Sequence, residues 1–245
     1  NEVVKSMVMR NDIVDSFMQR IMGSPVSKEK KYVYSDIDFI LLGKIVEAVA
    51  KMPLEQYVYK HFYQPMGLNS IGYKPLRFID ADRIVPSVKE RIFRNGELKG
   101  YVHDQSAALM NGIAGHAGLF GDAYNVGAIM QMLVDSGSWN GQSYFKKETI
   151  NTFTSYHSNT SRRGLGFDKP EKDNTTRQEP YPALSSTAST FGHTGFTGTC
   201  AWADPEKGLV FIFLSNRIYP EDNGVFKALN IRPKLLEMVY QGLQK

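Results

Sequence analysis

The sequence predicts an α+β fold, and three observations support this class. Helical periodicity recurs in apolar segments between residues 3 and 155, a strand-turn-strand pattern fills residues 198–217, and a further helical pattern closes the chain. The 245 residues are 42% hydrophobic, 12% aromatic and 22% charged, which is typical of a globular protein with a sizeable core. Helices followed by a hairpin and a closing helix therefore indicate an α+β unit.

Several segments have the periodicity of helices. Residues 36–51, DIDFILLGKIVEAVAK, predict a strongly apolar helix with Ser35 or Asp36 as its cap. Residues 53–68 predict a second helix that ends at the proline and glycine of PMGL. Further helical patterns lie at residues 3–22, with a possible break near residue 11, and at residues 123–136 and 147–155.

The remaining segments predict loops, strands and one closing helix. Residues 70–120 are expected to form loops with small strands, and residues 156–190 a polar surface excursion. The run GTCAWADPEKGLVFIFLSNR predicts two strands joined by a turn at residues 204–208. Residues 226–244 predict the closing helix, whose main part is expected to start at Pro233.

The charged residues do not favour a nucleic-acid partner. The formal net charge of +4 comes from 29 Lys and Arg against 25 Asp and Glu, and both signs are mixed along the chain. The clusters SKEKK at residues 27–31 and SRR at residues 161–163 are expected to be solvated surface rather than phosphate-binding sites. We therefore expect no binding to nucleic acid.

Cysteine content and apolar runs narrow the class of protein further. Cys200 is the only cysteine, which excludes an internal disulfide, and its apolar surroundings predict a buried, inert thiol. No apolar run reaches the roughly 18 residues needed to span a bilayer. The N-terminal segment lacks the features of a signal peptide. Because the chain begins without Met and enters a helical pattern at once, we expect it to be a piece of a longer protein.

Two short motifs carry the candidate chemistry. YSD at residues 34–36 leads into the apolar helix, and HTG at residues 193–195 opens the strand region. The partial positive charge at a helix N-terminus favours a phenolate, so Tyr34 can act as a base. A glycine beside a strand lets substrate backbone approach closely, and a threonine hydroxyl can donate to a carboxylate. Together the two motifs indicate acyl transfer.

With these motifs, the chain resembles the C-terminal part of the β-lactamase-related serine hydrolases, the group of class C β-lactamases, penicillin-binding proteins and esterases. The matching segments are, in order, YSDIDFILLGKIVEAVAKMPLEQYVYKHFYQPMGL, AGHAGLF and GHTGFTGTCAWADPEKGLVFIFLSN. The resemblance implies one incomplete β-lactamase/transpeptidase-like domain over residues 1–245. In it, residues 1–188 would form a mostly helical lobe, and residues 189–245 would supply strands and the closing helix of the α/β lobe.

The resemblance also implies catalytic roles and two departures from the family pattern. Tyr34 would be the base or proton relay, and Asp36 would replace an amide-bearing asparagine. This negative charge disfavours substrates with a carboxylate nearby. His193 would stand where many relatives have lysine, and a neutral imidazole removes the fixed cation that anchors β-lactam carboxylates. Both departures favour an esterase or peptidase over a β-lactamase.

Further residues are implied to contact substrate. Thr194 and Gly195 would line the substrate carboxylate or acyl chain, and the Phe196 N–H would be the strand donor to the oxyanion, worth about 3 to 4 kcal/mol. His116 in AGHAG and Asp104 in VHD lie near the site rim in relatives, so we expect loop hydrogen bonding first and substrate contact second. No third metal ligand falls at a recognisable spacing, so we expect no metal, and no cofactor is implied.

The nucleophile of this family is a Ser-x-x-Lys at the start of a buried helix, well before the tyrosine motif. The sequence contains two matches, at residues 27–30 in a charged loop and at residues 143–146 beside a turn. Neither opens an apolar helix in the required order. We therefore expect the serine to lie outside this sequence and the chain by itself to be inactive.

The resulting hypothesis is a fragment of a serine hydrolase that cleaves an ester, an amide or a D-amino-acid peptide bond through an acyl-enzyme. Its substrate would be a small molecule or of peptidoglycan type, and its location periplasmic or exported. Similar sequences also occur as C-terminal modules of bacterial proteins that begin with a part resembling family 3 glycoside hydrolases. The alternative is a non-catalytic, degenerate binding or accessory module of a cell-wall or glycan-active protein. An exposed sheet edge would permit self-association.

Overall fold

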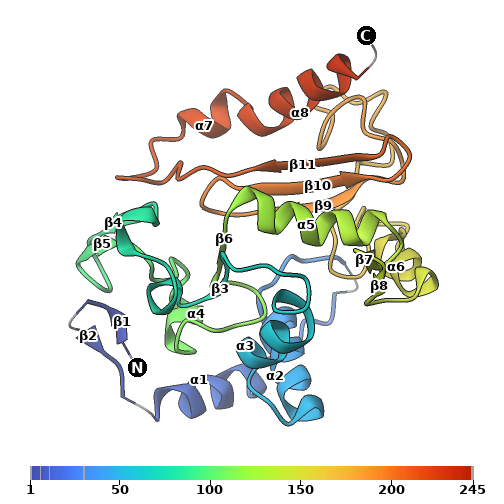
Figure 1. The fold of residues 1–245 in the computed structure, drawn as a ribbon. Coiled ribbons are helices and arrows are strands. Elements are labelled where there is room, and N and C mark those ends of the chain that lie inside the picture. Colours follow the sequence, from blue (N-terminus) through green and yellow to red (C-terminus); the bar gives the residue numbers. More distant parts are fainter. Residues whose placement is uncertain (1, 6, 11, 30, 244–245) are drawn as a thin grey trace. The chain divides into compact units, whose positions relative to one another are not determined.

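The computed structural model describes residues 2–5, 7–10, 12–29 and 31–243. The chain divides into two compact units, one of residues 1–121 with residues 218–221 and the other of residues 122–217 with residues 222–245 (Figure 1). Each unit contains helices and antiparallel strands, which confirms the predicted α+β class. Within the described residues, no helix is both long enough and apolar enough to cross a bilayer.

The first unit consists of helices and two-stranded antiparallel pairs. Its helical segments are α1 (Ile13–Met22), α2 (Ile37–Ala50), α3 (Leu54–Val58), the π-helical turn η1 (Tyr59–Tyr63), the 3₁₀ turns η2 (Pro75–Arg77) and η3 (Ala81–Arg83), and α4 (Gln105–Leu109). Its strand pairs are β1 (Glu2–Val4) with β2 (Met7–Val8), β3 (Ile71–Tyr73) with β6 (Leu119–Gly121), and β4 (Val88–Glu90) with β5 (Gly96–Leu98). Its core gathers side chains of β1, α2 and α4, among them Val3, Ile40 and Ala107.

The helix predicted at residues 36–51 is confirmed as α2. The helix predicted at residues 53–68 is confirmed as α3 and η1, but it ends earlier than expected. The helix predicted at residues 3–22 is wrong in its first part, because β1 and β2 pair there and α1 begins only at Ile13. Val3 and Val4 are 3% and 7% exposed, and such buried β-branched side chains suit a strand.

The second unit places helices on a three-stranded antiparallel sheet. Its helices are α5 (Ala123–Val134), α6 (Lys147–Thr154), α7 (Val225–Ala228) and α8 (Ile231–Gly242). The sheet has the order β11-β10-β9, with β9 at Phe191–Thr194, β10 at Cys200–Asp204 and β11 at Leu209–Phe213. A short pair joins β7 (Ser138–Trp139) and β8 (Gln142–Ser143).

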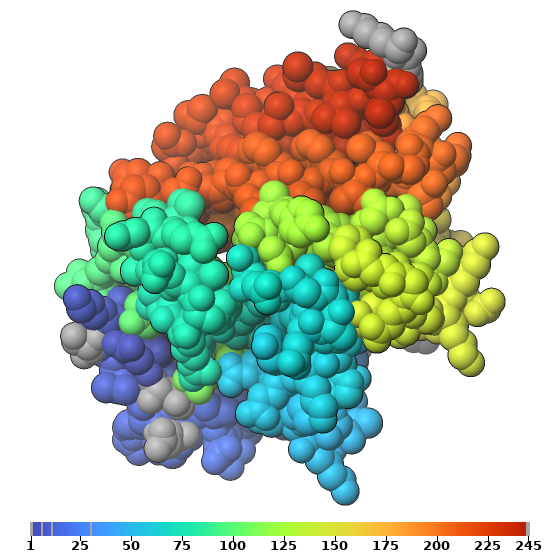
Figure 2. Space-filling model, in the orientation of Figure 1, coloured from blue at the N-terminus to red at the C-terminus, as the bar shows by residue number. Residues whose placement is uncertain are grey.

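Both faces of the central strand β10 are buried, because successive side chains point to opposite faces and each face is covered by a helix. Trp202 packs with Leu236 and Tyr240 of α8, whereas Ala203 packs with Met130 of α5 and Phe191 of β9. The strands and α8 fill one continuous region of this unit, coloured orange to red in Figure 2. The sheet therefore lies between α5 and α8, and the predicted hairpin and closing helix are confirmed.

Three details of the second unit refine the predictions. Cys200 is buried, and burial raises the pKa of its thiol to about 11, as expected of an inert cysteine. The last helix begins at Ile231 rather than at Pro233. The boundary between the two compact units follows residue 121, because α5 packs on β10 and β11 and so belongs to the second unit. The division of one incomplete domain into lobes at residue 188 stays a prediction.

Candidate functional site

The YSD motif forms the entrance to α2 in the first unit. Asp36 is the N-cap residue, and Ser35 Oγ, one residue earlier, accepts a hydrogen bond from the N–H of Ile37, the first residue of α2, at 3.2 Å. The Asp36 side chain makes no capping hydrogen bond, which leaves its carboxylate to other contacts. Tyr34 is 59% exposed. The motif thus presents an accessible phenol and a carboxylate ahead of a helix N-terminus, where partial positive charge stabilises anions.

The Asp36 carboxylate lies in a cluster with Asp104 and His116. One ligand atom from each of the three lies within 4.8 Å of the other two. Asp104 Oδ1 accepts a hydrogen bond from the Ala107 N–H at 2.7 Å and lies 2.8 Å from His116 Nε2. The His116 side chain is 4% exposed, and its Nδ1 has no hydrogen-bond partner among the described residues. The cluster joins the YSD motif to the VHD and AGHAG segments.

The Asp104 carboxylate is stabilised in its charged form. Burial acts to raise the pKa of Asp104, but the hydrogen bonds from His116 and Ala107 outweigh burial and hold this pKa below its usual value. The hydrogen bonding expected for the loop of His116 is therefore confirmed. Contact between His116 and a substrate stays a prediction.

The same cluster is the place in the described part of the chain where three side chains gather closely enough to hold a divalent cation. The spacing of residues in the sequence indicated no third metal ligand beside Asp104 and His116. The fold brings the Asp36 carboxylate to them. Asp104 Oδ1 already accepts two hydrogen bonds, so the cluster is also satisfied as a hydrogen-bonded unit. The expectation of no metal stays a prediction.

Two glycines bring the AGHAG loop against α2. A Cβ atom on Gly115 would lie 2.1 Å from the Phe39 carbonyl oxygen, and one on Gly43 would lie 3.1 Å from the Gly115 nitrogen. Because both obstacles are backbone atoms, neither position accepts a side chain without movement of the loop or the helix. This close packing places His116 next to Asp36.

The HTG motif lies on β9 in the second unit, and its histidine is neutral. Arg163 Nη1 lies 2.6 Å from His193 Nε2, and His193 Nδ1 lies 2.8 Å from the Thr194 carbonyl oxygen. Because a guanidinium can only donate, Nε2 must accept, and Nδ1 carries the proton. Burial, together with the Arg163 charge, lowers the pKa of His193 despite the opposing hydrogen bond to Thr194.

Arg163 therefore places a cation beside the neutral imidazole, and Asp168 shares that cation. The expectation that no fixed cation anchors a substrate carboxylate at His193 stays a prediction. Arg163 Nε lies 3.3 Å from Asp168 Oδ1. Arg162 binds both oxygens of the same carboxylate, at 2.7 and 3.0 Å, and the Tyr181 hydroxyl donates to Asp168 Oδ2 at 2.7 Å. Asp168 is 1% exposed, and it exchanges two backbone hydrogen bonds with Gly192 of β9.

The prediction that the SRR segment at residues 161–163 is solvated surface is wrong. The side chains of Arg162 and Arg163 are only 29% and 19% exposed, because Asp168 holds both guanidinium groups against β9. A signal was present in the sequence, since RRGLGFD places two arginines shortly before an aspartate in a glycine-containing segment. Sequence alone could not show that this segment pairs with the HTG strand.

The turn after the motif is held by two further arginines. The Gly195 N–H donates to the Thr199 carbonyl at 2.8 Å, and Arg232 Nη1 donates to the carbonyls of both residues. Phe196 is 63% exposed, and the Arg217 guanidinium lies 5.0 Å from its ring centroid. Phe196 therefore lies in a turn, and its expected place in a strand is wrong because β9 ends at Thr194. Its role as an oxyanion donor stays a prediction.

Thr194 faces the interior of the second unit. With Trp202 and Arg232, it lines a cavity of about 160 Å³. The roles of Thr194 and Gly195 in binding substrate stay predictions. Tyr34 belongs to the first unit and His193 to the second.

The serines of the two Ser-x-x-Lys matches are exposed and lie outside helices. Ser27 is exposed in a loop, and its Oγ accepts the Glu29 N–H at 3.1 Å, while Lys30 lies outside the described residues. Ser143 is exposed on β8, and its Oγ donates to the Phe145 carbonyl at 3.4 Å. Neither serine begins a buried helix, in keeping with the sequence analysis.

Comparison with known sequences identifies relatives over most of the chain. The family model described as Beta-lactamase matches residues 5–235. A protein of Escherichia coli (strain K12) named "Putative D-alanyl-D-alanine carboxypeptidase" is 34% identical over 214 residues, which are 82% of this chain and 49% of that protein. A protein of the same name from Salmonella enteritidis PT4 is 31% identical over the same shares. The chain thus spans about half the length of the curated relatives it matches.

Solved structures show the same fold. A β-lactamase from Mycobacterium bovis has a TM-score of 0.58 at 16% identity, over 87% of this chain and 65% of that one. A penicillin-binding protein homolog from Caulobacter crescentus has a TM-score of 0.56 at 18% identity, over 83% and 58%. Simvastatin synthase from Aspergillus terreus has a TM-score of 0.59 at 15% identity, over 95% and 61%. With the family match over residues 5–235, we conclude that this chain belongs to the Beta-lactamase family.

Proposed function

We propose that the protein containing this chain is a serine hydrolase that forms an acyl-enzyme and removes the last residue from peptides ending in D-amino acids. The observation that carries this proposal is the contact of Arg163 with His193 in the HTG motif of a Beta-lactamase family chain. A peptidase that releases a terminal residue must recognise a free carboxylate, and a guanidinium binds carboxylates well. The name of the Escherichia coli relative supports the same substrate class.

The cation at Arg163 alters the substrate preference that is expected from His193 alone. A neutral His193 by itself favours substrates without a carboxylate. A guanidinium 2.6 Å from the imidazole supplies positive charge beside His193, and Asp168 offsets part of that charge. Carboxylate-bearing peptides are therefore favoured over simple esters.

The proposed chemistry proceeds in two steps. A serine hydroxyl attacks the carbonyl carbon of the penultimate residue, the C–N bond breaks, and the leaving amine takes up a proton. Water then hydrolyses the ester and regenerates the serine. We propose that the serine belongs to a Ser-x-x-Lys segment that is not among these 245 residues, because Ser27 and Ser143 of the two matches are exposed and lie outside helices.

In this reaction Tyr34 would carry the proton, since it is accessible ahead of α2. The Phe196 N–H would hydrogen-bond to the oxyanion. Asp36 and His116 would contact the acyl portion of the substrate, as the cluster with Asp104 holds both near the YSD motif.

The proposal is tested on protein expressed from its complete reading frame. We expect a penicillin-type probe to label it, and we expect Tyr34→Phe to lower the labelling rate. Release of D-alanine is compared for a peptide ending in D-Ala-D-Ala and for the matching C-terminal amide. Wild type should prefer the acid, and Arg163→Met should lower kcat/KM for the acid by about 10²-fold, the loss of one charge-assisted contact.

Arg177→Met is the matched control, because Arg177 pairs with Asp173 and Glu171. It should keep the preference for the acid. Absence of labelling and of D-alanine release would favour the non-catalytic, degenerate module instead. Equal turnover of acid and amide by wild type would contradict the role of Arg163.

We further propose an exported or periplasmic location, because D-amino-acid peptides occur in bacterial cell walls. Self-association stays a proposal, supported by β11, which pairs with β10 only on one side within the described sheet. Fusion to a family 3 glycoside hydrolase also stays a prediction.

A further inference from the structure

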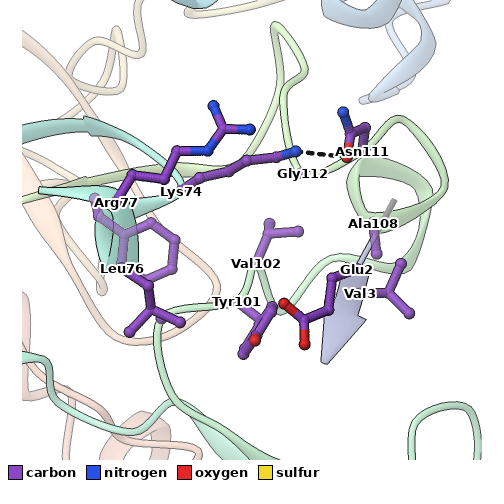
Figure 3. A pocket seen from close by; sticks show the side chains of 12 residues that line it. Glu2, Val3, Lys74, Leu76, Arg77, Tyr101, Val102, Ala108, Asn111 and Gly112 are labelled. Atoms are coloured by element: carbon purple, nitrogen blue, oxygen red, sulfur yellow. Dashed lines mark hydrogen bonds between the residues drawn. The ribbon is translucent and has the colours of Figure 1, made fainter. Parts of the chain in front are cut away.

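The first unit contains a cavity of about 290 Å³ that none of the predicted site residues lines. The segment after β3 forms one wall, and strand β1 with the segment after β5 forms another (Figure 3). The turn after α4 completes it. The cavity has charged groups of both signs on its walls and apolar side chains between them.

Lys74 and Arg77 make one part of this wall positive. Lys74 Nζ donates to Asn111 Oδ1 at 2.5 Å, and Figure 3 shows this contact beside the Arg77 guanidinium. Within the described chain, the hydrogen-bond acceptor of the ammonium is thus a neutral amide. Burial and the nearby Arg77 charge lower the pKa of Lys74, against a smaller opposing effect of Glu55, so its charge is incompletely compensated.

Arg77 is only weakly paired. Its Nη1 lies 3.3 Å from a Glu55 carboxylate oxygen, and its side chain is 59% exposed. An ion pair at this distance and exposure contributes little, in the range of about 0 to 1 kcal/mol. A carboxylate between Lys74 and Arg77 would therefore gain two charged donors.

The backbone fixes the position of the Lys74–Asn111 pair. Lys74 has a φ of 52° and Asn111 a φ of 63°, both in the left-handed region. Pro75 follows Lys74 and disfavours a right-handed helical conformation at that residue. Such left-handed residues cost of order 1 kcal/mol or more each and concentrate at binding sites. The backbone conformation sets the direction of both side chains, and the hydrogen bond to Asn111 positions the ammonium.

The cavity also contains an acidic group. The Glu2 carboxylate lies near Tyr101, away from Lys74 and Arg77 in Figure 3. Burial raises the pKa of the Tyr101 phenol, and the hydrogen-bonded Glu2 carboxylate raises it further. Val102 lies between the acidic and basic groups.

We propose that this cavity binds a small zwitterion, an amino acid or a dipeptide, with its carboxylate between Lys74 and Arg77 and its ammonium at Glu2. A volume of about 290 Å³ is just below the range of drug-sized ligand sites, about 300 to 1,000 Å³, and suits a smaller ligand. Val102 would contact a short aliphatic side chain. Binding at this cavity would require both the carboxylate and the ammonium of the ligand. A site for a simple anion would require only the negative charge.

The proposal is tested by isothermal titration of protein expressed from its complete reading frame with alanyl-alanine of both chiralities, its N-acetyl derivative, its C-terminal amide and inorganic phosphate. We expect saturable 1:1 binding of one dipeptide, and at least tenfold weaker binding of each capped derivative and of phosphate. Because the titration measures binding alone, its result does not depend on whether the proposed hydrolysis occurs.

Variants assign the two ends of the ligand. Lys74→Met should abolish the preference for the free carboxylate, and Glu2→Gln should abolish the preference for the free amine. Lys74→Arg should retain binding, which separates loss of charge from loss of folding. Arg83→Gln, on η3 outside the cavity, should bind as wild type does. Equal binding of free and capped dipeptides, equal binding of phosphate, or equal binding by Lys74→Met and Arg83→Gln would overturn the proposal.

Discussion

The regions around the YSD and HTG motifs satisfy their charged groups in different ways. At YSD the tyrosine is exposed, and the motif is tied to the rest of its unit by close backbone packing and the cluster of Asp36, Asp104 and His116. At HTG the ion pairs are largely buried, and the Asp168 carboxylate accepts from two arginines and a tyrosine. The first region depends on steric fit, and the second depends on compensation of charge.

The strongest test of this difference is Asp168→Asn. The substitution leaves Arg162 and Arg163 without their shared buried carboxylate, so we expect a loss of about 3 to 5 kcal/mol in unfolding free energy. Urea unfolding followed by the fluorescence of Trp139 and Trp202 measures it. Asp173→Asn is the control, because the Asp173 side chain is 64% exposed and its loss should cost less than about 0.5 kcal/mol. Similar losses for the two variants would show that the HTG region does not depend on its buried carboxylate.

Gly115→Ala tests the steric fit at the YSD region. The new Cβ would lie 2.1 Å from the Phe39 carbonyl oxygen, so the loop or α2 must move, at a cost of about 1 to 3 kcal/mol. Thermal unfolding measures the loss. Gly96→Ala is the control, since its Cβ would lie 3.8 Å from the Arg94 carbonyl oxygen, an ordinary contact, and the change should be nearly neutral. An unchanged melting temperature for Gly115→Ala would contradict the close packing.

The pH dependence of stability sharpens the comparison through Asp104. Its pKa is lower in the folded chain than in the unfolded chain, so its stabilising contribution is complete above the unfolded value of about 3.9. This contribution disappears as pH falls through the lower, folded pKa. We therefore expect the unfolding free energy of wild type to fall more than that of Asp104→Asn between pH 5 and pH 2, measured by urea titration at each pH. Parallel curves would refute this expectation.

The smallest expected effect is on the titration of His193. Its pKa is lowered in the folded chain, so NMR should show the ring titrating below about 6.5, with the proton on Nδ1 at neutral pH. Arg163→Met should raise the pKa of His193 by removing a nearby positive charge, although burial keeps it from rising further. A ring that is protonated on Nε2 at neutral pH would contradict the geometry of the Arg163 contact.

Much of the fold could be predicted from the sequence because local patterns were strong. The apolar periodicity of residues 36–51 and the turn at residues 204–208 each specify an element without help from distant residues. Residues 3–22 show the opposite case, since spaced apolar residues there also fit the β1–β2 pair. Burial of Val3 and Val4 in the core decides between the two patterns.

The sequence by itself determined the two motifs, the order of the main helices and hairpin, and the absence of a disulfide. Only the tertiary structure decided which charged groups accompany each motif. It brought Asp104 and His116 to Asp36, and it turned SRR from apparent surface into a partly buried cation beside His193. The physical reason is that helices and turns follow from neighbouring residues, whereas the contact between a charge and its partner depends on chain segments brought together by burial of the core.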